Sequence, residues 1–184
     1  VTRNMEVVIR RPDGEDRWVL ANAAPVRNAE GRIVAGVVVF PDVTGLKRAE
    51  EELRQRLEFE RLITTISARF INCSSDDILS EISRALGELG EFARVDRAYV
   101  FTFSRDHRHM SCAAEWTAEG VGAHIDELQD IPTGSLSWWM NYMRRQDVFQ
   151  IVDTGLIPED QRAMRNILDG LGIEALIDVP LVRS

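Results

Sequence analysis

The sequence has 184 residues, of which 45% are apolar and 28% charged, the balance of a globular protein with one large domain or two small ones. It contains no run of roughly 18 uninterrupted apolar residues, which a membrane-crossing helix requires. The net charge of −8 argues against nucleic-acid binding, because phosphate contacts need a clustered positive surface. Two cysteines, Cys73 and Cys112, are too few for a disulfide framework and fit a reducing compartment. The sequence therefore predicts a cytoplasmic protein that does not bind nucleic acid.

The first 44 residues predict an antiparallel meander of three strands. Residues 5–10, 18–26 and 33–40 are rich in β-branched side chains, and the turn signals at residues 12–14 and 28–31 separate them. Three strands are too few to close a core by themselves. We therefore expect further elements of this domain upstream of the first strand.

A long helix is predicted over residues 46–70, where the apolar period changes from two to about 3.6 and neither proline nor glycine occurs. Its solvated face carries acidic and basic residues in equal number. A narrow apolar seam with mixed charges favours a parallel homodimer through this helix over packing against neighbouring domains. The apolar positions are Leu46, Ala49, Leu53, Leu57, Phe59, Ile63, Ile66 and Phe70.

The remaining residues predict a second unit that mixes helices and strands. A helix over residues 77–92 is followed by strands over 97–104 and 110–117, which we expect to pair as a hairpin. The fold class is therefore α+β. Further elements are a short helix opening at Ser135, a brief strand over 149–152, a helix over 159–171 after Pro158, and a strand over 173–182.

The beginning of the chain resembles the C-terminal half of a PAS domain. The order of its pieces carries this resemblance: a turn with Asp-Gly, a Trp-Val strand, a second glycine turn, and an Asp-x-Thr exit into a charged helix. The resemblance assigns residues 1–44 to the PAS unit and implies that its ligand-pocket helices and first strands lie upstream. The carriers are residues 11–18, 28–31, 42–44 and 47–51.

The end of the chain resembles a GAF domain, whose antiparallel sheet is flanked by helices. The resemblance assigns residues 73–184 to this unit, without the last strand and closing helix of the family, and leaves residues 45–72 as the connecting signalling helix. The carriers are residues 97–103, 115–120, 138–139, 148–153, 156–158, 171–173 and 175–181.

PAS, connecting helix and GAF in tandem are similar to the sensory halves of bacterial histidine kinases and diguanylate cyclases, which act in two-component and cyclic-di-GMP signalling. The resemblance implies a non-catalytic input module that passes the state of a small ligand or partner to an output domain in cis. The alternative is a structural dimerisation spacer that binds no ligand. The sequence identifies no cofactor.

Signal coupling is expected at the junction between sheet and helix. Asp42 and Thr44, two residues apart, can bind the free amides of the helix or a nearby arginine. The PAS resemblance implies that this motif passes strand movement to the helix, while an ordinary helix cap is the simpler reading. We expect Lys47 and Arg48 to complete a salt bridge to Asp42.

A candidate ligand pocket of the GAF-like unit is formed by aromatic and methionine side chains, which give a large and adaptable contact area. Core packing is the alternative for each of them. Trp138 and Trp139 point about 100° apart on a helix, so one is expected to be exposed or to face the pocket. The candidate residues are Phe101, Phe103, Met110, Trp116, Trp138, Trp139 and Met143.

Catalytic motifs for phosphate, dinucleotide, zinc-protease or nucleophilic-serine chemistry do not occur, so no catalytic residue is assigned and the chain is expected not to be an enzyme. His107, His109 and Cys112 contain metal-ligand chemistry, but their spacing matches no strong motif, and no metal site is assigned. Neither cysteine has the context for covalent bilin attachment in GAF relatives. Asp178 is expected on the polar face of its strand, with a ligand contact as the alternative.

Overall fold

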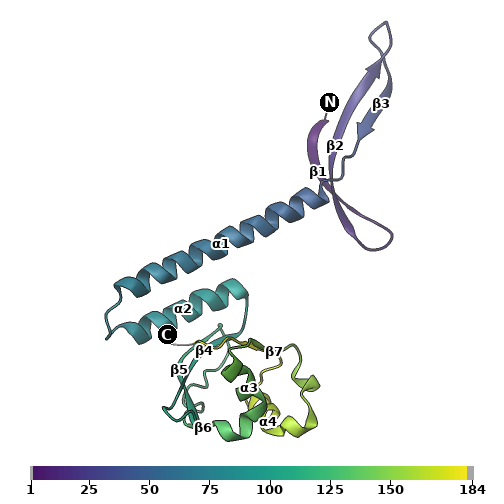
Figure 1. Cartoon of the computed structure of the whole chain (residues 1–184). Coiled ribbons are helices and arrows are strands. Elements are labelled where there is room, and N and C mark those ends of the chain that lie inside the picture. Colours follow the sequence, from purple (N-terminus) through teal and green to yellow (C-terminus); the bar gives the residue numbers. More distant parts are fainter. Residues whose placement is uncertain (1, 182–184) are drawn as a thin grey trace. The chain divides into compact units, whose positions relative to one another are not determined.

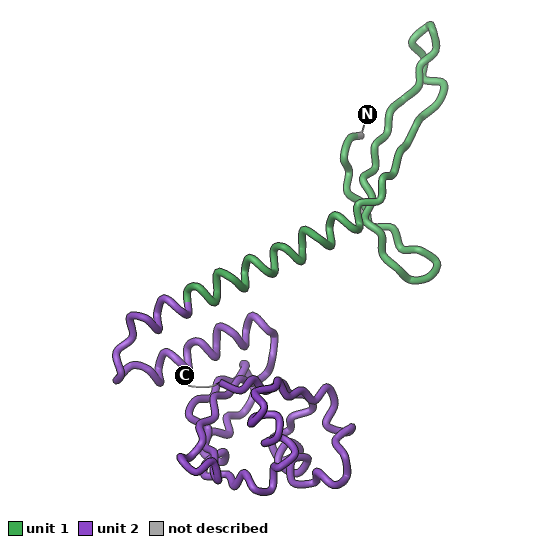
Figure 2. Tube along the Cα trace, viewed as in Figure 1, with its two compact units in different colours: residues 1–65 green, residues 66–184 purple. Residues whose placement is uncertain are grey.

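The computed structural model describes residues 2–181 and divides into two compact units, Val1–Thr65 and Ile66–Ser184 (Figures 1 and 2). Each unit contains antiparallel strands, and one long helix, α1, begins in the first unit and ends in the second. The predicted α+β class is confirmed. Among the described residues, no helix is both long enough and apolar enough to cross a membrane.

The first unit is a three-stranded antiparallel sheet in the order β1-β2-β3. Gly14 and Gly31 adopt positive φ angles of 86° and 79° in its two turns, a conformation that glycine reaches without strain. The predicted meander is confirmed, and its second strand is longer than expected. The strands are β1 (Thr2–Arg10), β2 (Asp16–Arg27) and β3 (Ile33–Val39).

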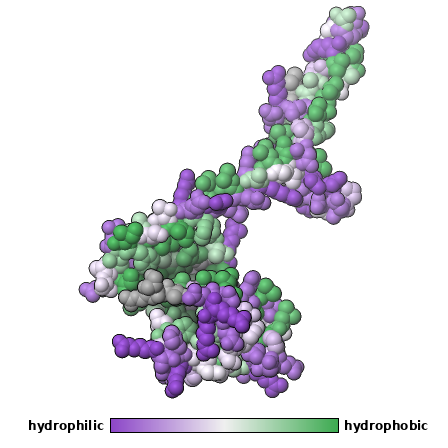
Figure 3. All heavy atoms as spheres, viewed as in Figure 1, coloured by the Kyte–Doolittle hydropathy of each residue, from purple (hydrophilic) through white to green (hydrophobic). Residues whose placement is uncertain are grey.

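Apolar side chains are exposed on this sheet, where Figure 3 shows hydrophobic residues at the surface of the first unit. Val37, Val38 and Val39 are all half exposed or more, although side chains alternate between the two faces of a strand. Val19 in the central strand is the buried exception, where it forms a bridge with Asp42.

Helix α1 spans Thr44–Asn72 and confirms the helix predicted over residues 46–70. Ion pairs between residues three and four apart support its exposed face, as Arg54 contacts Glu51 at 2.6 Å and Glu58 at 2.7 Å.

The second unit begins with helix α2 (Ile78–Ala93) and the antiparallel hairpin of β4 (Arg97–Phe103) and β5 (His109–Thr117). These elements agree with the prediction to within a residue or two. At the tip of the hairpin, His107 adopts a positive φ of 55°.

The rest of the second unit consists of short elements. The expected strand over residues 173–182 is wrong in length, because β8 is confined to three residues that pair with the equally short β7. Pro180, which has no backbone N–H, follows closely, and Val182 lies outside the described residues. The sequence analysis also missed β6. These elements are β6 (Ile131–Pro132), a 3₁₀ turn (Thr133–Leu136), α3 (Ser137–Arg145), β7 (Phe149–Ile151), α4 (Arg162–Gly170) and β8 (Leu176–Asp178).

The main core lies between the β4–β5 hairpin, the β7 strand and the helices α3 and α4. Phe149 is its most buried large side chain. A smaller cluster of Cys112, Leu128 and Leu171 adjoins it. The buried members of the main core are Met110, Leu136, Trp139, Met140, Phe149, Ile151, Ile157, Met164 and Leu168.

Candidate functional site

The first candidate site is the junction of the sheet and α1. The backbone N–H of Trp18 in β2 donates to Oγ1 of Thr44 at 2.8 Å, and Thr44 is only 3% exposed. The Thr44 amide in turn donates to Oδ1 of Asp42 at 2.8 Å. Asp42 therefore binds the first residue of the helix, while the Thr44 side chain binds the sheet.

The ion pairs at this junction differ from those expected. Among residues 2–181, Asp42 forms its ion pair with Arg17 of β2, at 3.7 Å, so the expected pairing with Lys47 and Arg48 is wrong. Lys47 instead contacts Glu6 of β1 at 2.8 Å. The reason is geometric: one turn into the helix, the Lys47 side chain reaches back over the sheet, where its ammonium lies 5.8 Å from the centre of the Trp18 ring.

Charge is favoured on the Asp42 carboxylate. Hydrogen bonding by the side chain and then by the amide of Thr44 lowers the pKa of Asp42, with smaller contributions from Arg17 and Arg11. The carboxylate is therefore an ionised acceptor at neutral pH, at the helix end where the dipole favours negative charge.

The second candidate site is the aromatic cluster of the second unit. Six of the seven predicted pocket residues belong to one group around the main core: Met110 and Trp139 are buried, and four others pack against the core as half-buried side chains. The rings contact each other, with centroids 6.0 Å apart for Phe103 and Trp139 and 5.0 Å apart for Trp138 and Phe149. The four half-buried residues are Phe101, Phe103, Trp138 and Met143.

Trp116 is the exception and lies outside this cluster. Its indole packs on α2, where a Cβ added to Gly87 would stand 3.0 Å from the ring and a Cβ added to Gly90 would overlap it. Placing Trp116 in the same pocket as Met110 is therefore wrong for the described structure.

A β-bulge explains the position of Trp116. Phe101 pairs with Cys112 and Val100 pairs with Ala114, so Ala113 is an extra residue in β5. One inserted residue moves every later side chain of the strand to the opposite face. Without the bulge, strict alternation along β5 would have placed Trp116 on the same face of the strand as Met110.

Trp138 and Trp139 divide as the helical angle implies. Trp139 is buried, and Trp138 is half-buried with its ring edge against Phe149. The Trp139 indole Nε1 donates to Oδ2 of Asp178 at 2.8 Å. Asp178 thus faces the buried tryptophan, and the expectation that it lies on the polar face of its strand is wrong.

The environment of Asp178 raises the pKa of its carboxyl, because burial disfavours the charged form more than the Trp139 hydrogen bond favours it. The sequence does contain a signal for this site. An acidic residue within the apolar run of residues 175–181 is expensive to bury unless a donor meets it.

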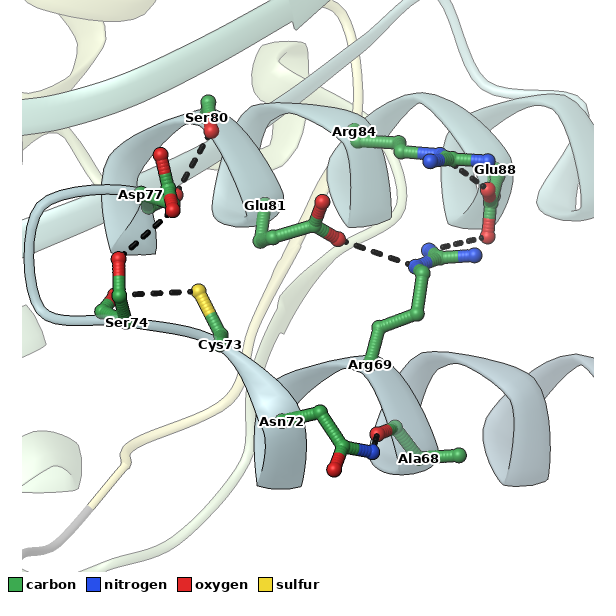
Figure 4. A network of polar contacts seen from close by, with 10 residues as sticks. All are labelled: Ala68, Arg69, Asn72, Cys73, Ser74, Asp77, Ser80, Glu81, Arg84 and Glu88. Carbon is green, nitrogen blue, oxygen red and sulfur yellow. Dashed lines mark hydrogen bonds and ion pairs between the residues drawn. The ribbon is translucent and has the colours of Figure 1, made fainter.

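A third polar group, which the sequence analysis missed, joins α1 to α2 within the second unit (Figure 4). Arg69 contacts Glu81 at 3.0 Å and Glu88 at 2.8 Å. We call these three residues the Arg69 clamp. The seven-residue spacing of the two glutamates, which places them on one face of a helix, was the available signal.

The cysteine and histidine side chains form no metal centre. Within residues 2–181, no three His, Cys, Asp or Glu side chains gather closely enough to hold a metal ion. The Cys112 thiol is buried and donates to the Ala114 carbonyl, and burial raises its pKa to about 11, so it stays protonated at neutral pH. His107 is exposed at the hairpin tip.

No protein-family model matches the sequence, and a search of the curated proteins finds no relative. The solved structures include a similar one, the chromophore-binding domain of an unusual bacteriophytochrome, RpBphP3, from R. palustris. The TM-score is 0.52 at 16% sequence identity, and the match covers 99% of this chain and 61% of that chain. The chain thus spans about three-fifths of that protein's length. At this identity the likeness establishes the fold: antiparallel sheets and a long connecting helix, as in the PAS and GAF region of a bacteriophytochrome.

Proposed function

We propose that this chain is a non-catalytic sensory module of a bacterial signal-transduction protein, which relays the state of a small ligand or partner through a dimeric helix to an output domain such as a histidine kinase or diguanylate cyclase. The observation that carries this proposal is the hydrogen bond from the Trp18 amide to the Thr44 hydroxyl. Through it, the central strand of a sheet is bonded directly to the first residue of a helix 29 residues long.

The junction is suited to transmission because its hydrogen bonds are short and the Thr44 side chain between them is buried. Any movement of Thr44 with α1 strains its hydrogen bond to the Trp18 amide. Asp42 also restrains Thr44, because its carboxylate accepts a hydrogen bond from the Thr44 amide. A shift of the sheet that left α1 in place would break the bond from the Trp18 amide and deprive the buried Thr44 hydroxyl of that donor, which costs free energy. Moving α1 together with the sheet avoids that cost.

Pairing of α1 with its copy in a second chain is supported by its exposed leucines. Leu46, Leu53 and Leu57 are 60%, 58% and 45% exposed and follow spacings of seven and four residues. Burying such a stripe against an identical one removes apolar surface from water. Two paired helices can then change register or rotation together.

The proposed ligand-binding site is the aromatic cluster together with Asp178. The similar bacteriophytochrome domain is a chromophore-binding domain, and aromatic side chains stack well against a planar molecule. The half-buried carboxylate of Asp178 accepts an N–H from Trp139 and can accept another from a ligand. A planar small molecule carrying N–H groups fits this chemistry.

Native mass spectrometry of the purified chain tests both parts of the proposal, because one spectrum reports the subunit count and any retained small molecule. We expect a dimer with added mass, and loss of the added mass in Asp178→Asn. Leu53→Gln with Leu57→Gln should give monomers, whereas the control Arg56→Gln, off the stripe, should stay dimeric. A monomeric unaltered chain would refute helix pairing. A dimer without added mass at any concentration would favour the spacer.

A further inference from the structure

Helix α2 lies between two contacts that come from different parts of the second unit. On one side, the Arg69 guanidinium at the end of α1 points between Glu81 and Glu88 (Figure 4). On the other side, the Trp116 indole of β5 lies against Gly87 and Gly90. Counting 100° per residue, Gly90 is about 180° from Glu81 around the helix, so the clamp and the tryptophan occupy opposite faces.

The geometry of the Arg69 clamp fixes α1 relative to α2 within the second unit. Its three side chains are only 20%, 22% and 28% exposed, and one planar guanidinium uses two different nitrogens on two carboxylates about two helical turns apart. A bifurcated arginine contact of this kind specifies orientation as well as distance. Rotation or sliding of α1 against α2 breaks one ion pair or both.

The contact of Trp116 with α2 is equally restrictive. Gly87 and Gly90 leave a flat strip of helix backbone on which the indole lies, and any side chain at Gly90 would occupy the same space. Glycine in a helix interior costs roughly 0.5–1 kcal/mol relative to alanine, so its presence at both positions indicates that close approach of the ring is needed. A shift of the β4–β5 hairpin therefore pushes directly on α2.

We propose that Trp116, α2 and the Arg69 clamp form a connector that passes displacement of the β4–β5 hairpin to the last two turns of α1. The proposal rests on the sensory function above. The connector would allow the second unit to act on the end of α1, while the Thr44 junction acts on its beginning in the first unit. Trp116 and Arg69 act here as positioning residues. Coupling of this kind is established only by a measurement in which removal of the joint abolishes the response.

A double-mutant cycle read by hydrogen–deuterium exchange provides that measurement on the full chain. Trp116→Phe reduces the ring that lies over Gly90, and we expect amide exchange in residues 66–72 to rise several-fold. Arg69→Gln removes the charge of the clamp and should raise exchange there by itself. In the Arg69→Gln background, Trp116→Phe should produce no further rise in residues 66–72, while its effect on α2 persists.

Arg84→Gln is the matched control, because Arg84 contacts the same Glu88 at 3.3 Å from the exposed side and leaves the clamp in place. The response to Trp116→Phe should survive in that background. If Trp116→Phe does not fold, Gly87→Ala, whose Cβ would press the indole by a few tenths of an ångström, replaces it.

Two results would overturn the connector: an equal response of residues 66–72 with and without Arg69, or a response of α2 that never reaches α1. The cycle needs neither a ligand nor an output domain. A chain that is monomeric and ligand-free in the mass experiment can still show the coupling, so failure of the connector and failure of the sensory function are separable.

Discussion

The indole N–H of Trp139 on α3 meets the carboxylate of Asp178 on β8 at 2.8 Å, and this bond ties two short elements at the edge of the main core. Trp139 is buried and Asp178 half-buried, so the bond operates where water competes weakly. The pair serves the fold by joining α3 to β8, and it holds the carboxylate in the orientation from which the proposed ligand site uses it.

Replacing Asp178 with asparagine should raise the thermal midpoint at pH 7. Burial raises the pKa of Asp178, so the folded state holds its proton more tightly than the unfolded chain. As pH rises from the ordinary aspartate pKa of about 3.9 through the raised folded value, the unfolded chain ionises first and stability is lost. Asparagine keeps an oxygen for the Trp139 indole without that loss.

The measurement for Asp178→Asn is a series of thermal melts from pH 3.5 to pH 7.5. The gain over the unaltered chain should appear across the window above about pH 4 and vanish below it, where both states of the unaltered chain are protonated. Asp147→Asn, an exposed aspartate close to α3, is the matched control. A gain of equal size at pH 3.5 and pH 7 would show that ionisation of Asp178 is not its cause.

Replacing Trp139 with phenylalanine should destabilise the second unit by roughly 1.5–3 kcal/mol, the range for losing a hydrogen bond to a charged group. A smaller aromatic ring remains in the core, but the donor to Asp178 is lost and the pKa of Asp178 rises further. Urea unfolding at pH 7 measures the change, with Trp138→Phe as control. In the Asp178→Asn background the loss should be smaller, and an undiminished loss there would assign the effect to packing.

The sequence predicted most helices and strands because their signals are local. The meander, the long helix and the β4–β5 hairpin are marked by β-branched runs, glycine turns and a period of 3.6, and all three are present. The strand expected over residues 173–182 failed because the length of β8 is set by its partner β7, a tertiary property. An apolar run shows that a segment is buried, but not how far it pairs.

The candidate sites were predicted less well than the elements, for two physical reasons. The bulge at Ala113, which moves Trp116 to the α2 face, leaves no mark in the pattern of apolar residues. The partners of charged groups depend on tertiary packing. Lys47 pairs with Glu6 and Asp42 pairs with Arg17, and both partners lie on strands whose position relative to α1 cannot be predicted from sequence spacing. The sequence placed Asp42 and Thr44 at the start of α1 because they stand where the apolar period changes from two to about 3.6, and their coupling role stays a prediction.

Replacing Gly90 with alanine should destabilise the second unit by roughly 1–3 kcal/mol, the cost of overpacking a well-filled site. The sign of the change in stability is diagnostic, because alanine otherwise stabilises a helix interior relative to glycine. Gly170→Ala in α4, where an added Cβ meets nothing within 4 Å, is the control and should be neutral or stabilising. Thermal unfolding compares the two, and a gain in stability for Gly90→Ala would mean that Trp116 does not lie on α2.

Replacing Thr44 with valine should loosen the junction of the sheet and α1 without altering its shape. Valine has nearly the same volume but no hydroxyl, so the Trp18 amide loses the acceptor of a part-buried hydrogen bond, at a cost of roughly 0.5–1.5 kcal/mol. Amide exchange at Trp18 should accelerate about tenfold for a loss of about 1.4 kcal/mol. Thr65→Val is the matched control, because the Thr65 hydroxyl bonds only to a carbonyl of its own helix. Unchanged exchange at Trp18 would show that the Thr44 hydroxyl does not hold the strand, and the relay would lose the contact on which it depends.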